Sequence, residues 1–161
     1  MDSMTNESPW LSPKQQRVWR EWLAMNAQLP AALHKQLQQD SGLSLPDFDV
    51  LVQLTEAPEE KVRIMPLANA LGWERSRLSH HIKRMESRDL VERQECSDDG
   101  RGAFVVLTPT GREAIERAAP EHARTVRELV FDSLTDDELD VLTQITNNVL
   151  NRVQRGRSSK A

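Results

Sequence analysis

Apolar residues recur at steps of three and four positions early in the chain, which is the spacing of one face of an α-helix. The series consists of Val18, Trp22, Met25, Leu29, Leu33 and Leu37. Ser12-Pro13-Lys14-Gln15 precedes it and is typical of a helix start, with Ser12 as N-cap and Gln15 closing a capping box. Pro30 lies inside the series and is expected to kink the helix or split it in two. Gly42 is expected to end it.

A second helical pattern begins at Leu45-Pro46-Asp47 and ends at the Ala57-Pro58 break. Its apolar positions are Phe48, Leu51, Val52 and Leu54. Residues 62–64 form a short run with β-branched side chains, which predicts a brief strand that pairs with a later hairpin. Pro66 is expected to open a further helix over residues 67–71, which Gly72 closes.

The middle of the chain combines a basic helix with a hairpin. In residues 75–88, Leu78, Ile82 and Met85 follow the i, i+4, i+7 spacing of a buried helix side. Two strand-like runs, residues 91–96 and 103–108, flank the turn-forming residues 97–102. Helix, turn, second helix and β-hairpin is the element order of a winged helix-turn-helix, a module that reads DNA.

Two further helices are expected after the hairpin. The first is interrupted by Pro120, where we expect a bend, and the second begins at a capping box over residues 135–138. The apolar positions of the second are Leu139, Leu142, Ile145, Val149 and Val153. The central module is too small to cover the apolar sides of both terminal helices, so we expect these helices to pack against a second copy. The alternative is that they form the monomer's own core.

The expected fold is therefore mainly α with a small β wing: a winged helix-turn-helix core whose N- and C-terminal helices form a dimerisation domain. The expected organisation is a disordered N-terminus over 1–9, an N-terminal dimerisation helix over 10–42, a winged helix-turn-helix DNA-binding domain over 43–110, C-terminal dimerisation helices over 111–154 and a basic tail over 155–161.

The formal net charge of −4 argues at first against nucleic acid as a partner, but the charge is unevenly distributed. Within residues 75–88 the basic side chains are Arg75, Arg77, Lys83, Arg84 and Arg88, against the single acid Glu86. Salt screens charges beyond about 10 Å, so a local basic helix attracts phosphates whatever the average charge. A cluster of basic residues on a helix is more often a solvated surface than a DNA contact. Here the order of the elements, helix, turn, helix and hairpin, favours DNA binding.

Several function classes are not expected. The N-terminus is polar, and no apolar run approaches the roughly 18 residues of a membrane span, so no membrane partner is predicted. The single cysteine, Cys96, suits a reducing cytoplasm. The histidines lack the spacing of a zinc site and no nucleophile elbow or phosphate loop is present, so we expect no metal, no cofactor and no enzyme activity.

The outward side of residues 75–88 carries side chains that suit a major groove: Ser76, Arg77, Ser79, His80, Lys83 and Arg84. Arginine reads guanine edges, while lysine and further arginine hold phosphates. Arg77 and His80, near the helix start, are expected to contact bases, and the other four to position the DNA backbone. We expect His81 on the core side and interpret Arg88 as solvated surface.

The hairpin tip is a second candidate DNA contact. Turn geometry alone requires residues such as Gly100 and Gly102. Arg101 is well placed to enter a minor groove narrowed by A·T pairs, where the negative potential is enhanced. Asp99 is expected to accept hydrogen bonds from its guanidinium group and hold it extended.

The hairpin sequence resembles the wing motif D-x-R-x-x-x-x-x-L-T of the MarR family of bacterial transcriptional regulators, through Asp99, Arg101 and Leu107-Thr108. Residues 67–72, 79–86 and 90–93 resemble the helix-turn-helix of the same family. Two residues depart from its pattern. Glu74 stands where a Ser or Asp N-cap is usual, and Asp89 stands where a Gly usually follows the helix.

The resemblance implies a homodimer that binds a pseudo-palindromic operator in double-stranded DNA, usually as a repressor. It also implies a small effector, often a phenolic or other anionic aromatic ligand, that binds between the dimer arm and the DNA module and lowers DNA affinity. Trp19, Trp22 and Met25 are candidate ligand-binding residues, with core or interface packing as the alternative. Some family members sense oxidants through an N-terminal cysteine that is absent here, so Cys96 is interpreted as inert. The rival interpretations are a winged-helix protein-interaction module and a non-specific architectural DNA-binding protein.

Overall fold

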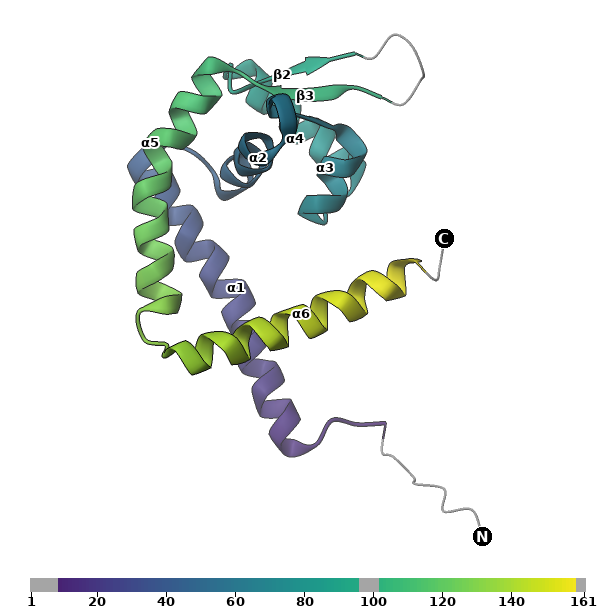
Figure 1. Ribbon diagram of the computed structural model, residues 1–161, viewed down its shortest axis with the longest axis vertical. Coiled ribbons are helices and arrows are strands. Elements are labelled where there is room, and N and C mark those ends of the chain that lie inside the picture. Colours follow the sequence, from purple (N-terminus) through teal and green to yellow (C-terminus); the bar gives the residue numbers. More distant parts are fainter. Residues whose placement is uncertain (1–8, 96–101, 159–161) are drawn as a thin grey trace. The chain divides into compact units, whose positions relative to one another are not determined.

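The computed structural model describes residues 9–95 and 102–158 and divides the chain into two compact units, residues 1–119 and residues 120–161. The predicted wing residues Asp99 and Arg101, and also Cys96, lie outside the described residues. The elements in chain order are α1 (Pro13–Ser41), α2 (Leu45–Glu56), a 3-10 turn (Pro58–Glu60), β1 (Lys61–Arg63), α3 (Ile64–Leu71), α4 (Arg75–Ser87), β2 (Val91–Gln94), β3 (Phe104–Leu107), α5 (Pro109–Val126), a π-helical turn (Arg127–Phe131) and α6 (Asp136–Ser158) (Figure 1).

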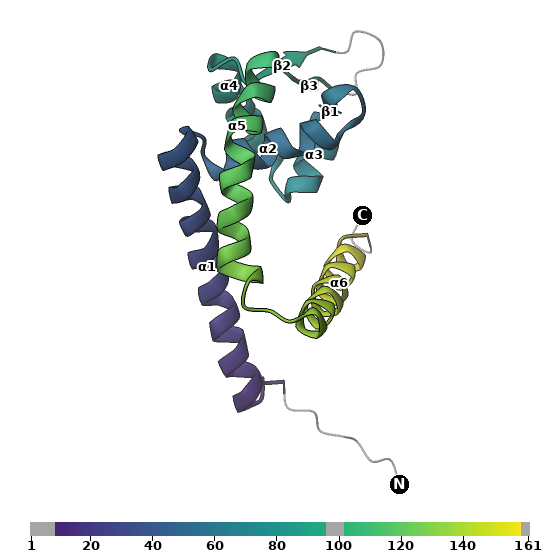
Figure 2. The same ribbon diagram turned by 60° about the vertical axis from the view of Figure 1, so that its left-hand side comes forward.

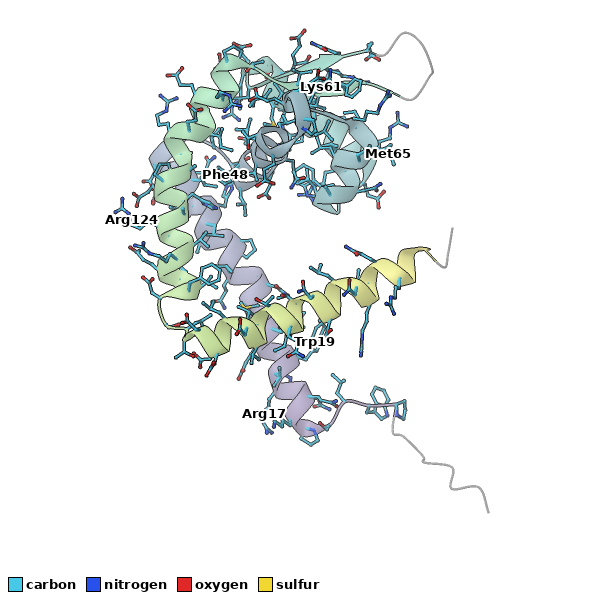
Figure 3. The ribbon with its side chains drawn as sticks, viewed as in Figure 1. Arg17, Trp19, Phe48, Lys61, Met65 and Arg124 are labelled. Carbon is cyan, nitrogen blue, oxygen red and sulfur yellow. The ribbon has the colours of Figure 1, made fainter. Side chains whose placement is uncertain are left out.

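The first unit is a three-stranded antiparallel sheet with helices α2, α3 and α4 on one side of it (Figures 1 and 2). The strand order is β1-β3-β2, and Val105 of the central strand pairs with Val62 and with Arg93. The expected pairing of a brief early strand with the hairpin is therefore confirmed. At the sheet surface the Lys61 ammonium lies 5.5 Å from the centre of the Phe104 ring (Figure 3).

The core lies between these helices and the sheet because each helix turns its periodic apolar side inward. Phe48 points into this core from α2 (Figure 3). The side chains at most 1% exposed include Leu37, Val50, Leu51, Leu54, Leu67, Leu78, Ile82, Met85, Val91 and Val105. The sequence periodicity of the middle of the chain therefore identified the buried side of α4 correctly.

The predicted starts of α1, α2 and α6 are confirmed, whereas α3 begins at Ile64, two residues before the predicted start at Pro66 and inside the run predicted as a strand. Ser12 and Gln15 form the capping box of α1, and Thr135 and Glu138 form that of the last helix. Of the two outcomes expected at Pro30, the split does not occur, because α1 continues past it, and α5 likewise continues past Pro120. A proline removes one backbone hydrogen bond, and a long helix with many others tolerates that loss.

The end of α4 is joined tightly to the start of α5. Asp89 adopts a left-handed backbone, with φ of 57°, and its carbonyl oxygen accepts from the Thr108 hydroxyl. Its carboxylate accepts from the Thr110 hydroxyl at 2.8 Å, and Thr108 Oγ1 accepts from the amide of Gly111 at 2.9 Å. The aspartate thus takes the place usual for glycine and supplies a side-chain hydrogen bond as well.

Apolar side chains remain exposed on α1 and on α6. On α6 they are Val141, Ile145, Val149, Leu150 and Val153, each 45% to 54% exposed. On α1 they include Val18, Trp19, Leu23 and Met25, each 46% to 55% exposed. None of the helices in the described residues is long and apolar enough to span a membrane.

Candidate nucleic-acid interface

Helix α4 is held by its apolar side and presents its basic side outward. Leu78, Ile82 and Met85 are each at most 1% exposed, which fixes the rotation of the helix. Glu74 is the N-cap residue but makes no side-chain capping bond, in line with the poor capping ability of glutamate. The predicted DNA-contact residues that are exposed are Ser76, Arg77, His80, Lys83 and Arg84, and Ser79 is half-buried.

A cleft of about 520 Å³ runs along one side of α4 toward β2. It is lined by Ser76, Ser79, His80, Ile82, Lys83, Glu86, Arg93 and Glu95. Glu86 accepts a hydrogen bond from the Arg93 amide at 3.0 Å, which joins α4 to β2. Four of the predicted contact residues thus share one concave surface.

A second cleft, of about 390 Å³, lies on the other side of α4, against α1 and α2. It is lined by His34, Gln38, Ser44, Pro46, Asp47, Arg77, His81, Arg84 and Arg88. Its only carboxylate is that of Asp47, among five basic or histidine side chains. The side of α4 that faces this cleft is therefore strongly cationic.

Asp47 is the buried centre of this cleft, with only 2% of its surface exposed. Its Oδ2 accepts from the Ser44 amide at 2.9 Å and from Arg88 Nη1 at 2.7 Å. Its Oδ1 lies 3.0 Å from His81 Nε2, in a close contact whose alignment departs from that of an ideal hydrogen bond. Burial alone would raise the pKa of Asp47, but contacts with His81, Ser44 and Arg88 outweigh it and hold the pKa well below its usual range.

The contacts of His81 define its tautomer. Arg84 Nη2 lies 3.0 Å from His81 Nδ1, and a guanidinium group can only donate. Nδ1 therefore accepts, and the ring proton sits on Nε2, facing Asp47. This arrangement confirms that His81 lies on the core side of α4, where it is 7% exposed.

Arg88 is exposed, as its interpretation as solvated surface predicted, but it also has a buried partner. Its guanidinium group donates to the carboxylate of Asp47, 41 residues away in sequence. Arg77 is exposed but contacts an aromatic ring, because its guanidinium carbon lies 4.3 Å from the centre of the Trp73 ring. Asp47 and Trp73 had no place in the predicted site, although Ser44 three residues before Asp47 is the spacing of a capping box.

The predicted ligand-binding residues lie away from both clefts. Trp19 and Met25 are exposed on α1 and Trp22 is half-buried there, and none of them lines either cleft (Figure 3).

Replacing Asp47 with asparagine is expected to destabilise the fold by about 2 kcal/mol at neutral pH, because Arg88 loses its buried counter-charge. Because folding lowers the pKa of Asp47, its charge stabilises the protein above about pH 4, the ordinary pKa of an unfolded aspartate. That stabilisation is lost on acidification, so the difference between wild type and variant should shrink toward about pH 3. Urea unfolding of wild type and variant, from neutral pH down to about pH 3, measures this difference in the free energy of unfolding.

The matched control is Asp40→Asn, which changes an exposed aspartate that accepts from Gln36 on α1. We expect an effect within about 0.5 kcal/mol at neutral pH for this surface change. Equal losses of stability for the two variants would show that the buried carboxylate of Asp47 stabilises the fold no more than an exposed one does.

Comparison with known proteins agrees with this geometry. A family model described as MarR family matches residues 41–102. The structure is similar to that of AbsC, a MarR family transcriptional regulator from Streptomyces coelicolor, with 37% identity over 91% of this chain and 99% of that chain and a TM-score of 0.85. It is also similar to Sco3205, a MarR family transcriptional regulator from the same organism in complex with DNA, with 38% identity over 92% of this chain and 93% of that chain and a TM-score of 0.87. The transcriptional repressor MprA of Escherichia coli K12 is 27% identical over 114 residues, which cover 71% of this chain and 64% of MprA.

Proposed function

The chain belongs to the MarR family of transcriptional regulators, which are not enzymes, and from this premise we propose that it binds a pseudo-palindromic DNA operator as a homodimer. The observation that carries the proposal is the outward basic side of α4, held in place by its buried apolar side. The similarity to Sco3205, whose structure contains DNA, supports it. Two copies of α4 would enter successive major grooves about 34 Å apart.

Within this proposal, Arg77 and His80 contact base edges. Ser76, Ser79, Lys83 and Arg84 hold the DNA backbone, as their hydroxyl and cationic groups suit phosphate oxygens. The cleft shared by Ser76, Ser79, His80 and Lys83 supports a common surface for these contacts. Asp99 and Arg101, outside the described residues, are proposed to contact the minor groove from the hairpin tip.

The dimer is proposed to form through residues 10–42 and 111–154, leaving residues 43–110 to bind DNA. Apolar side chains on α1 and α6 that are about half exposed in one chain support this assignment, since a second copy would cover them.

The regulator is further proposed to act as a repressor that a small aromatic or phenolic ligand releases. The similarity to a protein named a transcriptional repressor supports the first part. Trp19, Trp22 and Met25 are the residues proposed to line the ligand site, because aromatic and thioether side chains suit an aromatic ligand.

Replacing Arg77 with alanine is expected to weaken binding to the DNA upstream of the protein's own gene by about 30-fold or more. The dimer loses the contact twice, and each base contact contributes about 1–3 kcal/mol. Fluorescence anisotropy with labelled fragment and excess non-specific competitor measures the effect.

The control is Arg17→Ala, which removes an exposed arginine from α1 (Figure 3) and should leave the affinity unchanged. If Arg77→Ala and Lys83→Ala both bind as wild type does at moderate salt, the proposed interface is wrong. If competitor DNA displaces the fragment at equal concentration, the protein is an architectural binder instead.

A further inference from the structure

Trp73 occupies the turn between α3 and α4, directly after the left-handed residue Gly72. Its amide donates to the carbonyl of Ala68 at 2.9 Å, which fixes its backbone against the end of α3. The side chain is half-buried, so one part of the indole is packed and another part is accessible. A tryptophan in this position contacts the first turn of α4.

The indole ring of Trp73 makes two different contacts, one with a cation and one with an imidazole ring. The guanidinium carbon of Arg77 lies over the ring, 4.3 Å from its centre, which is a cation–π arrangement. The ring of His81 meets it edge-on, with centres 5.5 Å apart and an angle of 86° between the planes. Trp73 thus joins an exposed cation to a buried imidazole.

The buried side of this arrangement is held by polar contacts. His81 is held between Asp47, 3.0 Å from Nε2, and Arg84, 3.0 Å from Nδ1. Asp47 is in turn tied to the start of α2 through the Ser44 amide. A continuous series of contacts therefore runs from the buried start of α2 through His81 and Trp73 to Arg77.

Stacking leaves the useful part of Arg77 free. The contact with Trp73 is made through the guanidinium carbon, 4.3 Å from the ring centre, and a cation–π contact of this kind uses no N–H group as a hydrogen-bond donor to an acceptor atom. The N–H groups are the ones that donate in pairs to O6 and N7 of guanine. An arginine restricted in this way also has fewer conformations to lose on binding, which favours one base geometry over others.

We propose that Trp73 is a positioning residue for DNA reading, which holds the guanidinium group of Arg77 in one pose and so sets selectivity at the base pair that Arg77 contacts. This inference rests on the proposed function of Arg77 as a base contact. Trp73 itself touches no base in this role. Its effect is therefore expected on selectivity for the operator and not on non-specific attraction to DNA.

The test is a double-mutant cycle with Trp73→Leu and Arg77→Ala, using the upstream DNA fragment and copies of it with symmetric base-pair changes in each half-site. Trp73→Leu should weaken binding to the unchanged fragment about 10-fold and leave non-specific binding unchanged. It should reduce discrimination at the same base pair that Arg77→Ala affects. In the Arg77→Ala background it should have no further effect, because the side chain that it positions is gone.

Trp73→Phe retains an aromatic face and should restore most of the affinity, which a purely steric role for the indole does not predict. It also serves if the leucine variant fails to fold, with thermal melting of each variant as the check.

The outcomes separate the two proposals. If Arg77→Ala has no effect on binding, the proposed function of Arg77 fails. If Arg77→Ala weakens binding but Trp73→Leu has no effect, or weakens operator and non-specific binding equally in both backgrounds, Trp73 is not a positioning residue and Arg77 remains a DNA contact.

Discussion

Replacing Val149 with glutamate is expected to convert the protein from a dimer to a monomer and to weaken operator binding by at least 100-fold. Val149 lies on the apolar side of α6 with Ile145 and Val153, and each is about half exposed in one chain. A carboxylate placed there would be buried without a counter-charge in the proposed dimer interface, which opposes association. Linking two binding modules raises overall affinity by about 10²–10⁴, and a monomer loses that gain.

The oligomeric state is measured by sedimentation velocity and the affinity by fluorescence anisotropy on the same samples. The matched control is Asn147→Glu, which adds the same charge on the polar side of α6 and should leave both quantities unchanged. A Val149→Glu protein that stays dimeric and binds DNA as wild type does would place the interface elsewhere.

Replacing Gly111 with alanine is expected to destabilise the protein by about 3 kcal/mol, although alanine normally favours a helix over glycine. A Cβ atom at this position would lie 2.0 Å from the carbonyl oxygen of Leu90 and 3.0 Å from Cδ1 of Leu107. The carbonyl belongs to the backbone between α4 and β2, so it cannot move aside as the end of a flexible side chain would. The expected fall in melting temperature is roughly 6–12 °C.

Gly156→Ala is the matched control because a Cβ atom there meets nothing within 4 Å. Gly156 lies in α6, so alanine should stabilise that helix by up to about 1 kcal/mol. A loss of stability for Gly111→Ala together with a gain for Gly156→Ala would confirm the close approach at Gly111. A neutral or stabilising Gly111→Ala would contradict it.

Much of the fold follows from short-range information in the sequence. The capping boxes at Ser12 and Thr135 and the buried side of α4 depend on residues three or four positions apart, and all were predicted correctly. The three-stranded wing was also predicted, because short β-branched runs and turn residues mark its strands.

The environment of Asp47 was not predictable in the same way. Its contacts with His81 and Arg88 join residues 34 and 41 positions apart, and no local pattern brings such groups together. Arg88 therefore looked like an ordinary surface residue, although it neutralises a buried carboxylate. Trp73 and Arg77 are only four residues apart, but their stacking depends on the left-handed turn at Gly72 and on the position of His81.

The joint between α4 and α5 has a mechanical consequence. Two hydrogen bonds join Asp89, just after α4, to Thr108 and Thr110 at the start of α5. The amide of Gly111 donates to Thr108, and Gly111 lies close to the backbone of Leu90. A displacement of the first turn of α5 is therefore expected to displace the residues that follow α4 with it. Spin labels on α4 and on the first turn of α5 would then keep a constant mutual distance.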